Sequence, residues 1–274
     1  MPRHGCGYLF KVICFLCFMA SYDVLGNILV AKFPDGMKVA EKRRKAERLL
    51  REKKSVRTVV EKIGKFSGRL RTQKTKWLAG EKTKEVLLTE NGCSFRLNVD
   101  TCYFSPRLST ERERIAKKVR RGERVLVLFG GVAPFAVVVA KAGRAAEVVS
   151  VELGREASKY ALENVKRNKL SGKLGIVQGD VRRMVSGLRG KWDRVVMARP
   201  RLSDSFLDVG LSVVRKGGVV HWYGFGHESE KKEMVAGLLE EAGKLRKKVT
   251  VSGVRVAGRL GPGMFRYRVD LKVS

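Results

Sequence analysis

A glycine-rich loop between an apolar run and a helical pattern is the feature of this sequence with the clearest chemical use. The loop Phe129–Phe135 (FGGVAPF) follows the β-branched strand pattern Val125–Phe129 and precedes the helical pattern Pro134–Ala142. A loop that joins a strand to a helix in this way presents backbone N–H groups to a nucleotide-like ligand. A glycine-rich turn is common on its own, so the prediction depends on partners elsewhere in the chain.

Two carboxylates at the ends of later apolar runs are such partners. Glu152 ends the run that begins at Val148, where an acidic side chain can accept hydrogen bonds from both hydroxyls of a ribose. Asp180 follows Gly179, at a position from which it can accept a hydrogen bond from an adenine amino group. Phe129 and Val181 are candidate walls for the adenine ring. The structural alternatives stay open: a solvated strand-end acid, an Asp that only shapes a turn, and two core side chains.

A Pro-Arg turn followed by a short basic helix precedes the loop, in the segment YFSPRLSTERERI from Tyr103 to Ile115. We predict that Thr110 caps this helix, with Glu113 completing a capping box. Glu111 then falls in the first turn, where the helix dipole and the adjacent Arg112 favour an ionised carboxylate. This acid is either a proton acceptor in a reaction or only a helix-end charge.

These segments together resemble the class I, S-adenosylmethionine-dependent tRNA (guanine37-N1)-methyltransferase family. The family pattern reads roughly YFSPRLxxERxRI, VxDMFAGVGPF, a strand-end acid, GD and MNLP. This chain has YFSPRLSTERERI, VLFGGVAPF, Glu152, Gly179-Asp180 and Met197-Ala198-Arg199-Pro200, and the resemblance extends over residues 21–274. A sister branch, which transfers an aminocarboxypropyl group in wybutosine synthesis, shares the fold. Pro134-Phe135 after the loop favours the methyltransferase.

The resemblance implies a function, a cofactor and a partner. It implies methylation of tRNA at N1 of guanosine 37, with S-adenosylmethionine as the methyl donor and the anticodon region of tRNA as the partner. It assigns Glu111 as the base that removes the N1 proton and Arg71 as the group that stabilises charge on O6, tasks that suit a carboxylate and a guanidinium. The implied residues that bind the cofactor and shape its site are Tyr103, Arg107, Arg112, Phe129, Gly131, Glu152, Asp180, Val181 and Pro200.

Three departures from the family pattern put the activity in question. Val127 stands where the family has an Asp, Ala133 where it has a loop glycine, and Ala198 where it has the Asn that helps to hold the guanine. The first two predict weaker cofactor binding, because an anionic anchor is lost and a Cβ is added in the loop. Arg199 could replace the lost Asn from the side. A catalytically degenerate tRNA-binding descendant therefore stays open beside the two enzyme readings.

The charge of the chain favours a polyanionic partner. Its 58 Lys and Arg residues exceed its 27 Asp and Glu residues by 31. The excess is spread out, with 22 basic and 10 acidic residues in the first hundred positions and 36 and 17 in the rest. This distribution excludes a simple basic tail and favours nucleic acid over a membrane surface. The clusters expected to meet phosphate are Lys42–Lys45, Lys117–Arg121, Lys166-Arg167, Arg182-Arg183 and Arg199–Arg201.

The first twenty residues imitate a signal peptide, with an apolar run from Tyr8 to Ala20. A wrongly assigned start codon or an apolar extension explains the run as well, and the implied chemistry favours a cytoplasmic, monomeric protein without a membrane partner. Cys14 and Cys17 have metal-site spacing, but no second pair or nearby His accompanies them, so no metal site is expected. All five cysteines are interpreted as small buried hydrophobes.

The elements that must position these residues form two parts. The pattern of residues 21–100 predicts a small α+β RNA-binding module. The pattern of residues 101–274 predicts a Rossmann-like α/β methyltransferase domain, whose sheet is mostly parallel with one reversed strand. The module's elements are strands at Leu25–Phe33 and Ser55–Ile63, a helix at Lys38–Lys54 and a hairpin around Asn91-Gly92. The domain's further strands are Val148–Glu152, Leu174–Gln178, Arg194–Met197, Gly218–Tyr223, Val249–Val256 and Met264–Val273. Its further helices are Glu156–Asn168, Ser203–Val214 and Glu228–Leu245.

Overall fold

The computed structural model describes residues 21–188 and 190–274, and the chain forms two compact units. The first unit holds residues 21–66 and 73–88, and the second holds residues 67–72 and 89–274. The division therefore falls along the chain between Leu88 and Thr89, before the predicted boundary at residue 100. The apolar segment 1–20, with Cys6, Cys14 and Cys17, lies outside the described residues.

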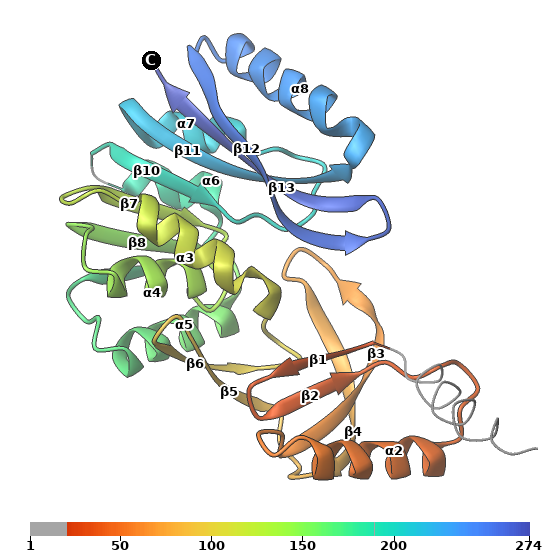
Figure 1. Cartoon of the computed structure of the whole chain (residues 1–274). Coiled ribbons are helices and arrows are strands. Elements are labelled where there is room, and N and C mark those ends of the chain that lie inside the picture. The colour runs from red at the N-terminus through yellow and green to blue at the C-terminus, as the bar shows by residue number, and fades with distance from the viewer. Residues whose placement is uncertain (1–20, 189) are drawn as a thin grey trace, which may run out of the picture. The chain divides into compact units, whose positions relative to one another are not determined.

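The first unit is a four-stranded sheet with one helix (Figure 1). The sheet order is β1 (Tyr22–Leu25), β2 (Ile28–Ala31), β3 (Thr58–Ser67), β4 (Thr72–Gly80). Helix α2 (Val39–Glu52) confirms the predicted helix to within its ends and buries Ala46 and Leu49 in the apolar core of this unit. The rest of α2 is largely polar, as its narrow apolar stripe predicts.

One strand prediction in this unit is wrong. Residues 25–33 do not form a single strand, because the chain reverses at Gly26 and pairs Leu25 with Ile28. Gly26 has φ +54°, and a Cβ there would lie 1.8 Å from the carbonyl oxygen of Leu87. The Asn27 side chain then fixes the turn, since its amide donates to Glu85 O at 3.1 Å and its oxygen accepts from Leu87 N at 2.7 Å.

The second unit contains a seven-stranded sheet in the order β12, β13, β11, β10, β7, β8, β9 (Figure 1). The neighbours from β11 to β9 are parallel and β13 is antiparallel to both β11 and β12, which confirms the prediction of one reversed strand. The strands are β7 (Arg124–Leu128), β8 (Glu147–Glu152), β9 (Leu174–Gln178), β10 (Trp192–Met197), β11 (Val214–His227), β12 (Val249–Gly261) and β13 (Met264–Val273).

Helices connect these strands as the alternating pattern predicts, except for the short helix Val181–Met184, which was not predicted. They are α3 (Ser109–Lys118), α4 (Pro134–Lys141), α5 (Arg155–Arg167), α6 (Val181–Met184), α7 (Leu207–Val213) and α8 (Lys231–Lys244), with 3-10 turns at Pro106–Leu108, Val185–Gly187 and Glu228–Glu230. A two-stranded hairpin of β5 (Glu85–Glu90) and β6 (Cys93–Asn98) turns at Asn91-Gly92, as predicted, with both residues at positive φ. Helix α7 starts later than predicted, because Phe206 adopts φ +56° and the Asp204 carboxylate accepts a hydrogen bond from its N–H at 2.8 Å.

The sheet core brings the ends of four parallel strands to one edge. Valine, leucine and methionine side chains of β7, β8 and β10 are almost completely buried between the covering helices. Because these strands and β9 run in the same direction, the residues that follow each of them meet at a single edge. The fold therefore places the glycine-rich loop, Glu152, Asp180 and Ala198 near one another.

The described residues contain no helix that is long and apolar enough to cross a membrane. Cys93 and Cys102 are buried free thiols, which agrees with the interpretation of these two as small hydrophobes. Among residues 21–188 and 190–274, no cluster of three metal-ligating side chains occurs.

Candidate active site

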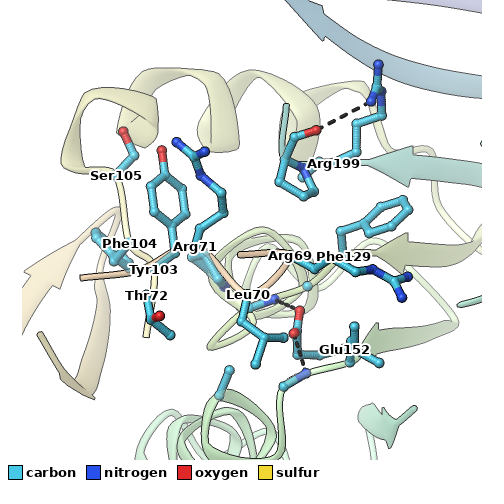
Figure 2. Close-up of a pocket in the computed structure, with 18 of the residues that line it drawn as sticks. Arg69, Leu70, Arg71, Thr72, Tyr103, Phe104, Ser105, Phe129, Glu152 and Arg199 are labelled. Carbon is cyan, nitrogen blue, oxygen red and sulfur yellow. Dashed lines mark hydrogen bonds between the residues drawn. The ribbon is translucent and has the colours of Figure 1, made fainter. Parts of the chain in front are cut away.

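A cavity of about 600 Å³ opens at the carboxyl edge of the sheet in the second unit (Figure 2). It is built from the segments that follow β7, β8, β9 and β10, together with the turn at residues 69–72. Of the residues implied by the sequence, those that line it are Arg71, Tyr103, Arg112, Phe129, Gly131, Glu152, Asp180, Val181 and Pro200. Two implied residues, Arg107 and Glu111, are not among the lining residues.

The glycine-rich loop has an unusual backbone. Phe129, Gly131 and Ala133 all adopt the left-handed conformation, with φ of 60°, 57° and 64°. The Gly130 N–H donates to Val151 O at 2.9 Å, which ties the loop to the end of the adjacent strand β8. Ala133 is the N-cap of α4 and is completely buried, so a residue with a Cβ occupies a conformation that glycine adopts without cost.

Glu152 organises the floor of the cavity. One carboxylate oxygen accepts the Gly131 N–H at 2.7 Å, and the other accepts the Gly154 N–H at 2.6 Å (Figure 2). Burial raises the pKa of Glu152, while these backbone hydrogen bonds act in the opposite direction. Each carboxylate oxygen has a second lone pair, so the side chain can still accept hydrogen bonds from a ligand's hydroxyls.

Asp180 lies on the adenine side of the predicted site. It is the N-cap of α6, where one oxygen accepts from Arg182 N at 3.0 Å. The other oxygen accepts from the Arg69 guanidinium at 3.0 Å, an ion pair within the second unit. Phe129, which lines the same cavity, packs edge-on against Phe206 with ring centroids 5.1 Å apart. Asp180 therefore shapes the turn, pairs with Arg69 and also lines the cavity.

Arg71 enters the cavity from the turn between β3 and β4. Its backbone adopts φ +55°, and Figure 2 shows its side chain and that of Tyr103 extending away from Glu152. The Tyr103 hydroxyl accepts a hydrogen bond from Arg266 at 3.3 Å. A guanidinium and a phenol thus lie in the same cavity as the Glu152 carboxylate.

Arg112 does not support Glu111, contrary to the prediction. Its guanidinium forms a two-pronged ion pair with Glu90, in which Nη2 donates to Oε2 at 2.5 Å, and it also donates to Ser105 O at 3.0 Å. It stacks 4.9 Å from the centre of the Phe104 ring. The helix position explains the difference, because Arg112 is rotated about 100° from Glu111 around α3.

The predicted capping box is also absent. Helix α3 begins at Ser109, its N-cap is Leu108, and no side chain bonds to the cap. The reason is that the 3-10 turn Pro106–Leu108 runs directly into the helix, which places Thr110 inside the first turn. The prediction that Glu111 lies in the first turn is nevertheless confirmed.

Glu111 is buried below the cavity rather than in it. Only 1% of the residue is exposed, and Oε1 accepts the Tyr223 hydroxyl at 2.8 Å and a hydrogen bond from Arg268. The other oxygen has Arg114 at 3.8 Å and makes no hydrogen bond. Burial and the adjacent Glu111 carboxylate raise the pKa of Tyr223 well above its usual range.

The sheet register places the pair that holds Glu111 two residues along the strands from the cavity. Tyr223 of β11 lies opposite Arg268 of β13, and the next pair on the same face of the sheet, Phe225 and Arg266, lines the cavity. Two residues along a strand span about 7 Å. The Glu111 carboxylate is therefore close to the cavity but held away from it.

Arg268 and Tyr223 are functional candidates that the sequence analysis missed. Arg268 belongs to a buried chain of polar contacts, since it also bonds to Asp270, whose carboxylate lies 2.6 Å from His221 Nδ1. His221 Nε2 in turn lies 2.6 Å from the Arg194 guanidinium. The available signal was the period-2 spacing of Arg266, Arg268 and Asp270 in β13, which puts three charged side chains on one face of a strand.

The protonation of His221 follows from its two neighbours. Arginine can only donate hydrogen bonds, so His221 Nε2 must accept and the ring is neutral, with its proton on Nδ1. Burial lowers the pKa of His221 to about 4, although the hydrogen bond with Asp270 acts in the opposite direction. Burial alone would raise the pKa of Asp270, but the bonds from His221 and Arg268 hold it well below its usual range.

Arg199 does not replace the missing guanine reader in this structure. Its guanidinium donates to the carbonyls of Leu202 at 3.2 Å and Asp204 at 2.9 Å, and it stacks 4.9 Å from the Trp222 ring. Only 7% of the residue is exposed, and burial lowers its pKa. Arg199 therefore fastens the loop after β10. Arg182 is similarly paired with two Asp side chains, and phosphate contact by these two residues stays a prediction.

The departures at the other two positions have different consequences. Val127 is completely buried in β7 between its neighbours Ser150 and Val196 and does not line the cavity. Ala198 does line the cavity, so the missing amide leaves an apolar surface there.

Comparison with known proteins identifies relatives of this fold and site. Residues 86–252 match the model of the TRM5/TYW2 methyltransferase domain, and residues 18–83 match that of the TYW2 N-terminal domain. The tRNA (guanine(37)-N(1))-methyltransferase Trm5b of Pyrococcus abyssi is 35% identical over 255 residues, which cover 93% of this chain and 75% of that protein. The enzyme Taw22 of Nanoarchaeum equitans, a tRNA (guanine(37)-N(1))/4-demethylwyosine(37)-methyltransferase, is 29% identical over 301 residues, covering 92% of this chain and 99% of that protein. A solved complex of aTrm5 with tRNALeu superimposes with a TM-score of 0.83 at 27% identity, covering 97% of this chain and 75% of that one.

Proposed function

Because this chain belongs to the TRM5/TYW2 methyltransferase family, we propose that it methylates tRNA at N1 of guanosine 37 with S-adenosylmethionine as the methyl donor. The observation that carries the proposal is the hydrogen bond from the Gly131 N–H to Glu152. It places a strand-end carboxylate beside the glycine-rich loop. The same cavity holds the Arg71 guanidinium, the group proposed to contact the guanine.

The residues of the cavity fit the proposed cofactor. Glu152 offers acceptors for ribose hydroxyls, Asp180 offers one for an adenine amino group, and Phe129 with Val181 provides apolar walls. When bound there, S-adenosylmethionine supplies an electrophilic methyl group. Tyr103 and Pro200 complete the lining, whereas Arg107 lies outside it.

We assign the proton transfer to Glu111 and the stabilisation of O6 to Arg71. The N1 proton of guanine must leave before a methyl group can be accepted there, and an ionised carboxylate can take it. The unbonded oxygen of Glu111 supports this role, because a buried acceptor without a partner is costly unless function requires it. Glu111 must be released from Arg268 and Tyr223 to reach the cavity, so RNA binding has to rearrange this contact.

Two other functions remain candidates, each favoured by one observation. Aminocarboxypropyl transfer in wybutosine synthesis is favoured by the match of residues 18–83 to a TYW2 N-terminal domain. A catalytically degenerate tRNA-binding protein is favoured by Ala198, which puts a methyl group where the family pattern has an amide.

One assay separates the three functions. Purified full-length protein is incubated with methyl-labelled S-adenosylmethionine and an unmodified tRNA transcript, and a transcript with guanosine 37 replaced by adenosine is the control. Label in RNA that requires guanosine 37, with S-adenosylhomocysteine as the by-product, is the expected result. Methylthioadenosine as the by-product would instead identify aminocarboxypropyl transfer. Tight tRNA binding without either product would identify the degenerate protein.

The partner and compartment follow from this proposal. The anticodon region of tRNA is the proposed partner, and the cytoplasm, where tRNA and S-adenosylmethionine meet, is the proposed compartment. We propose a monomer without a membrane partner, which sedimentation of the purified protein with and without tRNA would test.

A further inference from the structure

A second hollow lies away from the candidate active site. Its volume is about 950 Å³, and it is lined by residues 117–122 and 143–146 of the second unit. The lining contains five basic side chains and no acidic or aromatic one: Lys117, Lys118, Arg120, Arg121 and Arg144. A surface of this composition suits phosphate groups rather than stacked bases.

The hollow lies at the amino ends of the parallel strands, and the cavity lies at their carboxyl ends. The hollow is formed by the segments that lead into β7 and β8, whereas the cavity is formed by the segments that leave these two strands. Strands of this length span roughly 17–20 Å. The two sites are therefore well separated and cannot hold the same nucleotide.

Helix α3 contributes lining residues to both sites. Leu108 and Arg112, near its start, line the cavity, and Lys117 and Lys118, at its end, line the hollow. A ten-residue helix is about 15 Å long. An RNA strand that leaves the cavity along α3 would thus arrive at the hollow within a few nucleotides.

The exposed side of this path is basic. Six side chains between positions 107 and 121 are both exposed and basic: Arg107, Arg114, Lys117, Lys118, Arg120 and Arg121. Two of these charges are partly neutralised: Lys117 forms an ion pair with Glu113 at 2.6 Å, and Lys118 forms one with Asp270 at 3.5 Å. Glu111 is buried, so it adds little negative charge to the surface. The net positive charge of the path is sufficient to follow several phosphates.

We propose that the hollow binds backbone phosphates of the RNA that flanks the target nucleotide, with α3 as the track between them. This proposal rests on one part of the proposed function, namely that a nucleotide of the RNA enters the cavity. The contacts are independent of sequence, because the lining offers charge and no group suited to reading base edges. The hollow therefore selects substrates by their length and shape on one side of the target.

The test uses the double variant Arg120→Glu/Arg121→Glu of the full chain, since both side chains are exposed and neither belongs to the proposed catalytic machinery. The matched control is Lys231→Glu/Lys232→Glu on α8, which changes the net charge equally at exposed positions. Binding is measured against salt for two RNAs: a full-length tRNA transcript, and a five-nucleotide single strand with guanosine at its centre. Protein fold is checked by thermal unfolding.

We expect the Arg120→Glu/Arg121→Glu variant to bind the full-length transcript at least tenfold more weakly, with a log–log salt slope smaller by about 2. Its affinity for the five-nucleotide strand should stay within twofold of the wild type, and the α8 control should match the wild type with both RNAs. Equal weakening with both RNAs, or by both variants, would overturn the proposal. An unchanged affinity for the full-length transcript would also overturn the proposal. This holds even if the variant loses binding to phosphatidylserine vesicles or inorganic phosphate. Because the readout is binding, it is distinct from the methyl-transfer assay that tests the function.

Discussion

At the scale of single residues, Glu152 holds the loop and is proposed to hold the ligand. Its carboxylate accepts two backbone N–H groups, so removing it affects both the loop conformation and the ribose contacts. This residue was predictable from sequence because it needs only a strand end and a glycine-rich loop, both of which leave local patterns. The pairing of Arg268 with Glu111 was not predictable, because the two residues are 157 positions apart in the chain.

The first prediction concerns cofactor binding. Glu152→Ala should weaken S-adenosylmethionine binding by about 1–3 kcal/mol, the cost of leaving hydrogen bonds to the ligand and loop unmade. Calorimetric titration measures it, and Glu147→Ala is the matched control because Glu147 begins the strand that Glu152 ends. Equal losses in the two variants, or no binding by the wild type at millimolar cofactor, would contradict the assignment.

The second prediction concerns proton removal. Glu111→Gln keeps the size of the side chain but removes the base, so single-turnover methylation should fall by about 10²–10⁴-fold while cofactor binding persists. Arg71→Lys keeps the charge but loses the planar guanidinium, and its rate should also fall sharply. The wild-type rate should rise with pH and then level off. A near-normal rate and an unchanged pH profile for Glu111→Gln would leave Glu111 as a structural anchor of α3 against Arg268.

At the scale of elements, the start of α4 carries a backbone conformation that its residue does not favour. Ala133 has φ +64°, a conformation that costs an L-residue roughly 1–2 kcal/mol relative to glycine. Its methyl group is buried, which returns about 0.8 kcal/mol. The burial term offsets part of the strain and leaves a net cost of roughly 0.2–1.2 kcal/mol.

The third prediction follows from these terms. Ala133→Gly should leave the free energy of unfolding unchanged or raise it by up to about 1 kcal/mol, because strain relief exceeds the lost burial. Ala136→Gly, two residues into the same helix and equally buried, should lower it by roughly 2 kcal/mol through helix propensity and lost burial. Urea unfolding of both variants measures the difference. Equal destabilisation would mean that Ala133 is not strained.

The fourth prediction concerns the polar chain under β11 and β13. In the folded state burial lowers the pKa of His221 to about 4, so between this pH and about 6.5 the unfolded state binds more protons. Stability from this group is therefore complete above pH 6.5 and is lost as the pH falls toward 4. The loss at pH 5 should be about 2 kcal/mol.

Urea unfolding at pH 7.5 and pH 5.0 measures this loss. His221→Gln can still donate to Asp270 and accept from Arg194, and it should remove most of the extra pH dependence. His227→Gln, at an exposed histidine, is the matched control and should behave as the wild type. A His221→Gln variant that keeps the full pH dependence would show that other groups cause it.

The elements themselves were predictable to different degrees. The strands β7–β10 are short, apolar and bounded by glycine or charge, so their sequence pattern predicts them to within a few residues. Strand β4 was missed because its sequence, TQKTKWLAG, is mostly polar and lacks the apolar alternation of a half-buried strand. The turn at Gly26 was missed because the partners of the Asn27 side chain that fixes it, Glu85 O and Leu87 N, are distant in sequence.

At the scale of the whole molecule, the positive charge is shared by both units, so both are expected to meet RNA. Helix α2 of the first unit presents Arg43 and Arg44, which are exposed, whereas Lys42 is paired with Glu61 at 2.6 Å. The sequence alone predicts the cluster, but it cannot separate the paired member from its neighbours.

The fifth prediction tests this sharing of charge. Arg43→Glu/Arg44→Glu should weaken tRNA binding and reduce the log–log salt slope by about 2, because each lost phosphate contact releases fewer counterions. Fluorescence anisotropy over a salt series measures the slope, with the α8 pair Lys231→Glu/Lys232→Glu as the reference. A slope equal to that of the reference would restrict RNA contact to the second unit.

The space beside Gly130 links the side chain that this loop position can carry to the side chain of Ser150. A Cβ on residue 130 would lie 2.0 Å from the Ser150 hydroxyl oxygen, which is itself buried without a hydrogen-bond partner. The family pattern has alanine at position 130, so the two positions are not independent. An alanine at position 130 could therefore be accommodated in this chain only if the Ser150 side chain moved. Gly130→Ala alone should therefore destabilise this chain more than Gly130→Ala combined with Ser150→Ala.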